Sequence, residues 1–359
     1  ARDLAKALDD YQPGLKDIVY QKQLGSLHDK SVRVAEIAAY LADELGIDKE
    51  NTRRAAALAK CDLLSDMVGE FPDLQGIMGH YYAIKSGEDA NVAEALDEQY
   101  MPRFAGDKLP SNPIGQVLAL AEKLDTLVGI FSIGQIPTGD KDPFGLRRAA
   151  IGCLRIIIEC ELDLDLRASL EIAALQFDAT LASDDAVDPV FKFTMERLRR
   201  YYADTEISND IFEAVLSLSP VRPLDFHQRI HAVSKFATLA ESASLASANK
   251  RIQNILKQNE ASLANDINKD LLEESAEKLL VSALDTISIK VQPLLENSKY
   301  ADTLTTLAGL RDPVDNFFDE VMVMCDDEAI KLNRLALLKK LNTLFMTIAD
   351  ISKLQGQAD

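Results

Sequence analysis

The stretch at residues 109–158 constrains the fold most, because it reads as two helices separated by a glycine-punctuated turn. Asn112 and Pro113 supply a capping residue and a proline at the first helical position, where the missing N–H removes no hydrogen bond. Apolar residues then recur at steps of three and four until glycines interrupt the pattern. Asp142 and Pro143 begin the second helix in the same way, as cap and first residue. The stretch therefore predicts two core-facing helices.

Two arginines follow the start of the second helix. Arg147 and Arg148 lie close to its N-terminus, where backbone N–H groups have no partner within the helix. Guanidinium groups beside such N–H groups favour an anion, so the pair is a candidate phosphate site. The alternative is that both arginines form surface ion pairs with Asp140, Asp142 or Glu159.

The composition extends the helical prediction to the whole chain. Apolar residues make up 47% of the 359 residues, which suffices for two or three domains with cores. Alanine and leucine dominate, tryptophan is absent, and alternating runs of valine and isoleucine are nearly missing. The expected fold class is all-α.

Charge is distributed unevenly along the chain. The formal net charge of −19 argues against a nonspecific coat for nucleic acid. Residues 1–220 carry a net charge of −15 and residues 221–359 carry −4, yet the segment at 221–257 carries +4. A locally basic segment inside an acidic chain is compatible with localised contacts to phosphates.

The cysteines and the termini bear on location. Cys61, Cys153, Cys160 and Cys325 lack CxxC spacing, so we expect reduced, packed thiols and a cytoplasmic protein. Neither a signal peptide nor an apolar run of membrane length is present in the sequence. The chain does not begin with Met, and we expect it to be a fragment of a longer protein.

Three further basic sites precede residue 219. His80 adjoins two tyrosines, a combination that can stack on RNA, and Arg103 follows a proline in a loop that would display it. Arg199 and Arg200 lie in the cluster "MERLRRYYAD", whose mixture of basic and aromatic residues is typical of nucleic-acid contacts. For all of these residues, the alternative to an RNA contact is that the aromatic rings pack within the protein and the charged groups lie in solvent.

The second helix after residue 219 is the strongest of these candidates. Lys250, Asn254 and Lys257 share one helix face with Arg251 beside them, and no acid intervenes between positions 241 and 260. Arg229 lies on the preceding helix, which is also basic. The alternative is a solubilising face that covers a buried apolar side of the helix.

Long motifs along the chain resemble one family in that family's order. They include "EQYMPRFAGDKLPSNP", "LPSNPIGQVLALAEKLDTLVGIFSIGQIPTGDKDPFGLRRAA", "VRPLDFHQRIHAV" and "PVDNFFDEVMVMCDDEAIKLNRLALL". The family is the beta subunits of bacterial heterotetrameric glycyl-tRNA synthetases, and the resemblance covers nearly the whole chain. The ending "ADISKLQGQAD" resembles the family's C-terminus, so we expect the chain to be a C-terminal half of such a subunit.

The resemblance implies a function that is shared between two kinds of subunit. It implies a complex of two alpha and two beta subunits, a class II aminoacyl-tRNA synthetase, in which the alpha subunit uses ATP and Mg to activate glycine. The beta subunit holds tRNA(Gly), and this chain would need no cofactor. The chain contains no recognisable ATP site or nucleophile, so we expect it to be non-catalytic alone.

The first part of the chain also resembles the HD superfamily of metal-dependent phosphohydrolases. That resemblance places Lys30, Cys61, Asp62 and Glu122 where the superfamily holds two histidines and two carboxylates. A cation at the first position and a thiol at the second predict a degenerate HD domain without metal, in which Asp62 and Glu122 pair with Lys30. Two rival functions are a working HD phosphohydrolase and a scaffold for the alpha subunit.

The expected domains are an HD-like domain with accessory helices at 1–219 and an anticodon-binding bundle at 220–359. The resemblance places the first toward the acceptor arm of the tRNA, and the second resembles the helical, DALR-like domain of arginyl-tRNA synthetase relatives. Within the first domain we expect one helix over 48–71. In the second we expect Phe317, Phe318, Val321 and Met324 in the core and Asp315, Asn333 and Arg334 exposed or capping.

Overall fold

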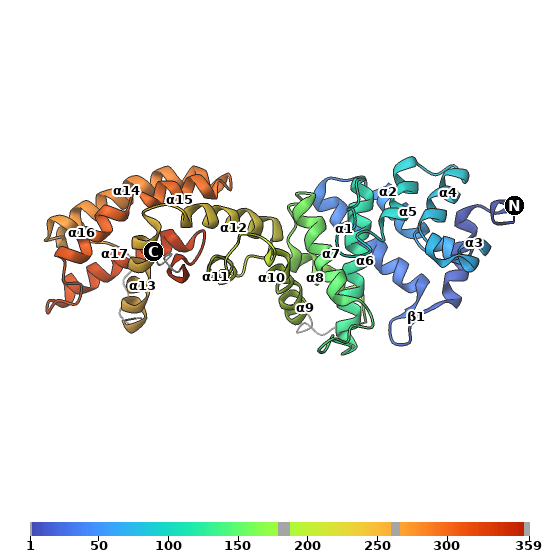
Figure 1. Cartoon of the computed structure of the whole chain (residues 1–359), viewed down its shortest axis with the longest axis horizontal. Helices are drawn as coiled ribbons and strands as arrows, with labels where there is room; N and C mark the ends of the chain where they lie inside the picture. The colour runs from blue at the N-terminus through green and yellow to red at the C-terminus, as the bar shows by residue number, and fades with distance from the viewer. Residues whose placement is uncertain (1, 179–186, 260–265, 355–359) are drawn as a thin grey trace. The chain divides into compact units, whose positions relative to one another are not determined.

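The computed structural model describes residues 2–178, 187–259 and 266–354, and these ranges are built almost wholly of helices (Figure 1). The all-α prediction is confirmed. The described strands are a short antiparallel pair, β1 (Val19–Gln21) and β2 (Gly25–Ser26). No helix in the described ranges is long and apolar enough to cross a membrane.

The chain divides into two compact units. The first comprises residues 1–204 and 221–224, and the second comprises residues 205–220 and 225–359. The predicted domain boundary at residues 219/220 stays a prediction; in the structure, α11 (Asn209–Leu216) belongs to the second unit.

The first unit is organised around one long buried helix, α6 (Pro113–Ser132). It packs against α1, α5, α7 and α8, and it passes so close to its neighbours that a Cβ at Gly129 would lie 2.8 Å from the ring of Phe177. The other helices of the unit, with 3₁₀ helices labelled η, are η1 (Asp3–Ala5), η2 (Leu8–Asp17), α1 (Leu27–Leu45), α2 (Lys49–Leu58), η3 (Cys61–Leu64), α3 (Asp66–Glu70), η4 (Pro72–Leu74), α4 (Ile77–Lys85), α5 (Ala90–Glu98), α7 (Leu146–Glu159), α8 (Leu166–Ala174), α9 (Val187–Met195) and α10 (Arg197–Tyr202).

Local capping explains where the two central helices begin. The Asn112 side chain accepts a hydrogen bond from the N–H of Ile114, and Pro113 is the first residue of α6, as the sequence predicted. At the start of α1, the Ser26 hydroxyl accepts from the Asp29 N–H while the Asp29 carboxylate accepts from the Ser26 N–H. This reciprocal capping box satisfies two backbone donors.

Two predicted helix limits were wrong. The second helix of the 109–158 stretch begins at Leu146, three residues later than predicted, because Gly145 turns the backbone at φ 66° and the Asp142 carboxylate reaches forward to the N–H groups of Leu146 and Arg147. The predicted helix over 48–71 is three short helices, α2, η3 and α3. It breaks because Ser65 has extended backbone and caps α3, its hydroxyl accepting from the Val68 N–H.

The second unit is a bundle in which α13 (Ser242–Gln258) packs against α16 (Arg311–Glu320), α17 (Glu328–Met346) and η8 (Ile351–Lys353). The long helix α14 (Ser275–Glu296) packs against α15 (Tyr300–Ala308), α16 and α17. The remaining helices are α11, η7 (Lys269–Leu271) and α12 (Pro223–Ala237), whose first two residues lie in the first unit.

The second unit corrects three predicted burial states. Arg334 is buried rather than exposed, because its guanidinium donates to the carboxylate of Glu277 at 2.7 Å and to the carbonyl of Met322 at 2.9 Å. Asn333 is also buried and exchanges two hydrogen bonds with the backbone of Asn268. Met324 is exposed instead of packed, because the chain has already left α16 there.

The other predictions for this part have mixed outcomes. Phe317 and Val321 are buried as predicted, whereas Phe318 is only half-buried. Asp315 is half-buried and accepts a hydrogen bond from the Ser244 hydroxyl at 2.7 Å. Asp315 thus contacts a neighbouring helix, so it is neither a helix cap nor a free surface residue.

The buried pair of Glu277 and Arg334 gives a prediction about stability. Arg334→Ala should lower the free energy of unfolding by about 3–5 kcal/mol, because it leaves a carboxylate buried without its partner. Lys340→Ala is the control on the same helix: Lys340 pairs with the part-exposed Asp285 at 2.8 Å, and exposed pairs contribute about 0–1 kcal/mol. Urea unfolding followed by circular dichroism measures both variants. Equal losses would contradict a structural role for the buried pair.

Candidate nucleic-acid interface

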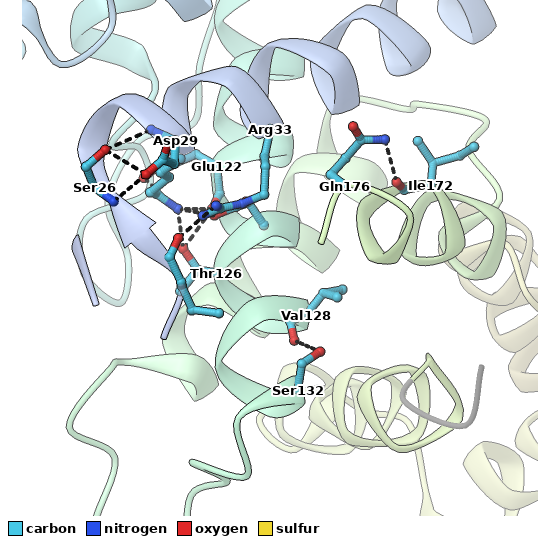
Figure 2. A network of polar contacts seen from close by, with 12 residues as sticks. Ser26, Asp29, Arg33, Glu122, Thr126, Val128, Ser132, Ile172 and Gln176 are labelled. Carbon is cyan, nitrogen blue, oxygen red and sulfur yellow. Dashed lines mark hydrogen bonds and ion pairs between the residues drawn. The ribbon is translucent and has the colours of Figure 1, made fainter. Parts of the chain in front are cut away.

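A buried ion-pair network between α1 and α6 contains Lys30 and Glu122, two of the four positions that the sequence comparison aligned with HD metal ligands. The ammonium of Lys30 lies 2.7 Å from the Asp125 carboxylate and 3.4 Å from that of Glu122. Arg33, one turn along α1, donates to the other oxygen of Asp125 at 2.6 Å. Figure 2 shows Arg33 of α1 and Glu122 and Thr126 of α6 pointing into the space between the two helices. The sequence predicted an ion pair for Lys30 but named only one of its two carboxylates.

Asp62 does not take part in this network, which corrects the predicted pairing with Lys30. One of its carboxylate oxygens accepts from the N–H groups of Gly76 and Gly79, at 2.6 and 3.1 Å. The break after α2 places Asp62 on η3, where it faces the start of α4 instead of α1. Lys60, which the sequence analysis did not select, contacts Glu122 at 3.3 Å.

The electrostatics of the network follow from burial and charge together. Burial alone would raise the pKa of Glu122, but the ammonium groups of Lys30 and Lys60 outweigh it and lower the pKa to about 2. Burial lowers the pKa of Lys60, whereas Asp125 and Glu122 hold the pKa of Lys30 above its usual value despite burial. Burial also raises the pKa of the Cys61 thiol to about 12. No group of three potential metal ligands occurs among the described residues.

The basic face on α13 is displayed as the sequence predicted. Lys250, Arg251, Asn254 and Lys257 are all exposed, while Ile252 on the other side of the helix is buried. Arg251 lies over the ring of Phe318, with its guanidinium carbon 4.3 Å from the ring centroid, so this arginine is held in one place. The four side chains therefore form one accessible polar face. Their contact with RNA stays a prediction.

Arg229 has a structural environment of its own. Its guanidinium pairs with Asp225 at 2.7 Å, lies over the ring of Tyr300, and donates to the carbonyls of Thr347 and Ile348 at 2.6 and 3.1 Å. Those carbonyls lie at and just after the C-terminal end of α17, where helix carbonyls have no intrahelical partner. Arg229 thus fastens α12 to the end of α17, and its predicted contact with tRNA remains untested.

The candidates of the first unit lie on different elements. His80 is half-buried on α4 in edge contact with Tyr81, and Arg103 pairs with Asp97 at 2.6 Å. Arg199 and Arg200 are exposed on α10, next to the buried Tyr202. Nothing in the described residues brings these three sites together.

The two arginines near the start of α7 differ from each other. Arg147 donates to the carbonyl of Gly139 at 2.5 Å, whereas Arg148 is exposed and forms no ion pair with any residue that the structure describes. The alternative pairing with Asp142 or Glu159 does not occur, because Asp142 caps α7 and Glu159 pairs with Arg155 at 2.8 Å.

Sequence reasoning missed Arg33, Asp125, Lys60 and Lys123, although a signal for the first two existed. Lys30 and Arg33 are three residues apart, and so are Glu122 and Asp125, so each helix presents two like charges on one face. That complementarity was readable only with the knowledge that α1 packs on α6. Nothing in the sequence marks the burial of Lys60 and Lys123.

Comparisons with known proteins give two family matches and many relatives. A family model described as "Glycyl-tRNA synthetase beta subunit" matches residues 1–217, and one described as "DALR anticodon binding domain" matches residues 245–354. Proteins named glycine–tRNA ligase beta subunit from Pseudoalteromonas translucida, Tolumonas auensis and Escherichia coli are 49%, 50% and 48% identical to the chain. These matches cover 98%, 95% and 98% of the chain but 51%, 49% and 51% of the relatives. The chain thus spans about half the length of the curated relatives it matches.

The lowered pKa of Glu122 gives a second prediction about stability. A folded-state pKa of about 2 against an ordinary 4.5 stabilises the fold above pH 4.5, and this contribution is lost as the pH falls from about 4.5 to about 2. Glu122→Gln should therefore lower the free energy of unfolding at pH 7 by about 3 kcal/mol and by less at pH 4.

Glu36→Gln is the matched control, because Glu36 pairs with Arg53 at 3.1 Å on the surface of the same unit. It should change the free energy of unfolding by less than about 1 kcal/mol at either pH. Urea titrations at pH 4 and pH 7 measure both variants. A deficit of Glu122→Gln that does not depend on pH would contradict the assigned ionisation.

Proposed function

The chain belongs to the glycyl-tRNA synthetase beta subunit family, and we propose that it holds tRNA(Gly) while glycine is joined to that tRNA. The observation that carries the proposal is the overlap of two independent features. The match to an anticodon-binding domain covers residues 245–354, and the exposed basic face of α13 lies within it. A domain of that kind and a displayed cationic face both suit the anticodon arm.

The chemistry of the α13 face fits an RNA strand. Ammonium and guanidinium groups bind phosphates, while an amide such as that of Asn254 donates to and accepts from a base edge. Among the described residues, Lys250, Arg251 and Lys257 form no ion pairs, so no carboxylate in the described ranges needs to be displaced before a phosphate binds. In an acidic chain, such a face favours RNA at this place over the surrounding surface.

The division of labour that we propose assigns the chemical step elsewhere. The alpha subunit would use ATP and Mg to activate glycine in an α₂β₂ class II synthetase of the cytoplasm, and this chain would need no cofactor. The HD-like unit would lie toward the acceptor arm. The support within this chain is the ion-pair network: Lys30 and Lys60 occupy the space around Glu122 where a hydrolase of the HD type would need a metal.

The two rival functions are less well supported. A metal-dependent phosphohydrolase would have to expel Lys30 from between Glu122 and Asp125 and to ionise a buried thiol. A scaffold that only supports the alpha subunit would have no use for an exposed cationic helix face. Neither rival accounts for α13.

Neutralising the α13 face should weaken tRNA binding. Lys250→Ala combined with Arg251→Ala should lower the affinity for tRNA(Gly) and reduce the log–log slope of affinity against salt by up to about two, one for each lost phosphate contact. Asn254→Ala should instead reduce discrimination among anticodon variants at nearly unchanged salt slope. Filter binding at two salt concentrations measures both effects.

The control for these variants is Lys278→Ala, because Lys278 is an exposed lysine on α14 of the same unit. It should bind tRNA(Gly) as the parent chain does. A folded double variant with the parent affinity and salt slope would overturn the assignment of α13 to the anticodon arm.

A further prediction concerns the absence of chemistry in this chain. The chain supplied with ATP, Mg, glycine and tRNA(Gly) should form no glycyl-tRNA, and elemental analysis should find no stoichiometric transition metal. Manganese- or nickel-stimulated phosphatase activity that Asp62→Ala abolishes would instead establish a hydrolase. Aminoacylation by the chain alone would refute the proposed division of labour.

A further inference from the structure

A hollow of about 510 Å³ lies in the first unit beside the start of α7. Its lining includes Gln75, Tyr100, Arg103, Lys123, Phe144 and Arg148. The volume falls in the range of sites that bind small molecules, which is about 300–1,000 Å³. Three of these six side chains are cations, in a chain whose net charge is −19.

Lys123 is the least expected of the three cations. Its side chain is buried, with 8% of the residue exposed, and its ammonium donates to the carbonyls of Met101 and Ala119 at 2.6 and 3.3 Å. No carboxylate of the described residues lies within ion-pair distance of it. Burial lowers the pKa of this lysine to about 8. A buried ammonium that forms no ion pair with a described residue favours an anion in the hollow.

The aliphatic part of the Lys123 side chain passes Gly152 of α7, where the absence of a side chain leaves room for it. A Cβ at Gly152 on α7 would lie 2.9 Å from Cε of Lys123, closer than a packed methyl group allows. The position of the ammonium is therefore set by the packing of α6 on α7, and the side chain is not a mobile surface lysine.

The two arginines add directional donors at the mouth. Arg148 is exposed and unpaired among the described residues, so its donors are available. Arg103 keeps one contact to Asp97 at 2.6 Å, which orients its guanidinium. The lining contains one carboxylate, that of Asp73, against the three cations. Guanidinium groups bind phosphate oxygens in pairs, so this set suits a phosphate.

Two N–H groups at the start of α7 are already hydrogen-bonded within the protein. The carboxylate of Asp142 already accepts from the N–H groups of Leu146 and Arg147, at 2.8 and 2.9 Å. An anion in the hollow would therefore meet side chains rather than the helix terminus.

Aromatic and amide groups accompany the cations. Phe144 is 39% exposed, and the hydroxyl of Tyr100 is shielded from solvent without a partner among the described residues. Nucleobases stack on exposed aromatic rings, and an amide such as that of Gln75 pairs with base edges. Inorganic phosphate alone would leave these groups unused.

We propose that this hollow binds a single 5′-phosphorylated nucleotide, with its phosphate between Lys123, Arg103 and Arg148 and its base against Phe144. The nucleotide has two sources: a residue of bound tRNA, which rests on the function proposed above, and a free mononucleotide. Both present the same phosphate, ribose and base.

The first experiment titrates the whole chain with AMP, adenosine and inorganic phosphate by calorimetry at low salt. AMP should bind saturably and at least about tenfold more tightly than adenosine or phosphate. Arg148→Ala and Phe144→Ala should each weaken AMP binding by about fivefold or more. Lys123→Met should do the same, and circular dichroism establishes whether that buried variant folds.

Matched controls remove the same side chains outside the hollow. Arg53→Ala and Phe104→Ala take away a half-buried surface arginine and an exposed phenylalanine of the same unit, neither of which lines the hollow. Both should leave AMP binding unchanged. The proposal is overturned if AMP binds no more tightly than adenosine, or if Arg148→Ala and Phe144→Ala behave like the controls.

The second experiment distinguishes the source. If the nucleotide belongs to tRNA, Arg148→Ala should weaken tRNA(Gly) binding and lower the salt slope by about one. If it is free, the same variant should lose AMP while tRNA affinity stays unchanged. Failure of the α13 variants to affect tRNA would refute the proposed function without touching the AMP result, so the two proposals fail separately.

Discussion

The carboxylate of Asp125 is the group on which the first unit depends. It is fully buried, and it accepts hydrogen bonds from Lys30 of α1 and from Arg33, whose guanidinium also donates to the carbonyl of Leu24 and lies over the ring of Phe177. Through Arg33, this charge connects α6 to α1, to the loop between β1 and β2, and to Phe177 just after α8. Buried charges of this kind persist only when every partner is present.

This dependence explains how Glu122 and Asp125 can be buried close together on α6 without a metal. A metal ion would supply positive charge that gathers carboxylates, and here Lys30, Arg33 and Lys60 supply it from within the chain. The second unit uses the same device on a smaller scale, where Arg334 and Glu277 join α17 to α14. In both units the buried ions position helices, and the cations that remain exposed are available for a phosphate.

Sequence patterns predicted a helix start well where capping is local, as at Asn112, because the cap and its donor are two residues apart. They failed where tertiary contacts decide. Arg334 looked like a surface residue because its partner Glu277 is 57 positions away. The partners of Lys30 depend in the same way on helices that meet only after folding, so spacing along the chain carried no information about them. The break before α3, in contrast, has a local cause in the cap at Ser65.

The contact between Lys123 and Gly152 links two positions that lie on different helices. A side chain at 152 would collide with the lysine stem, and a residue shorter than lysine at 123 would leave a void beside a glycine. A substitution at only one of the two positions is disfavoured, so the two positions should co-vary in evolution. Among relatives, a lysine at position 123 should occur together with a glycine at position 152. Such co-variation would reflect the packing of α6 on α7.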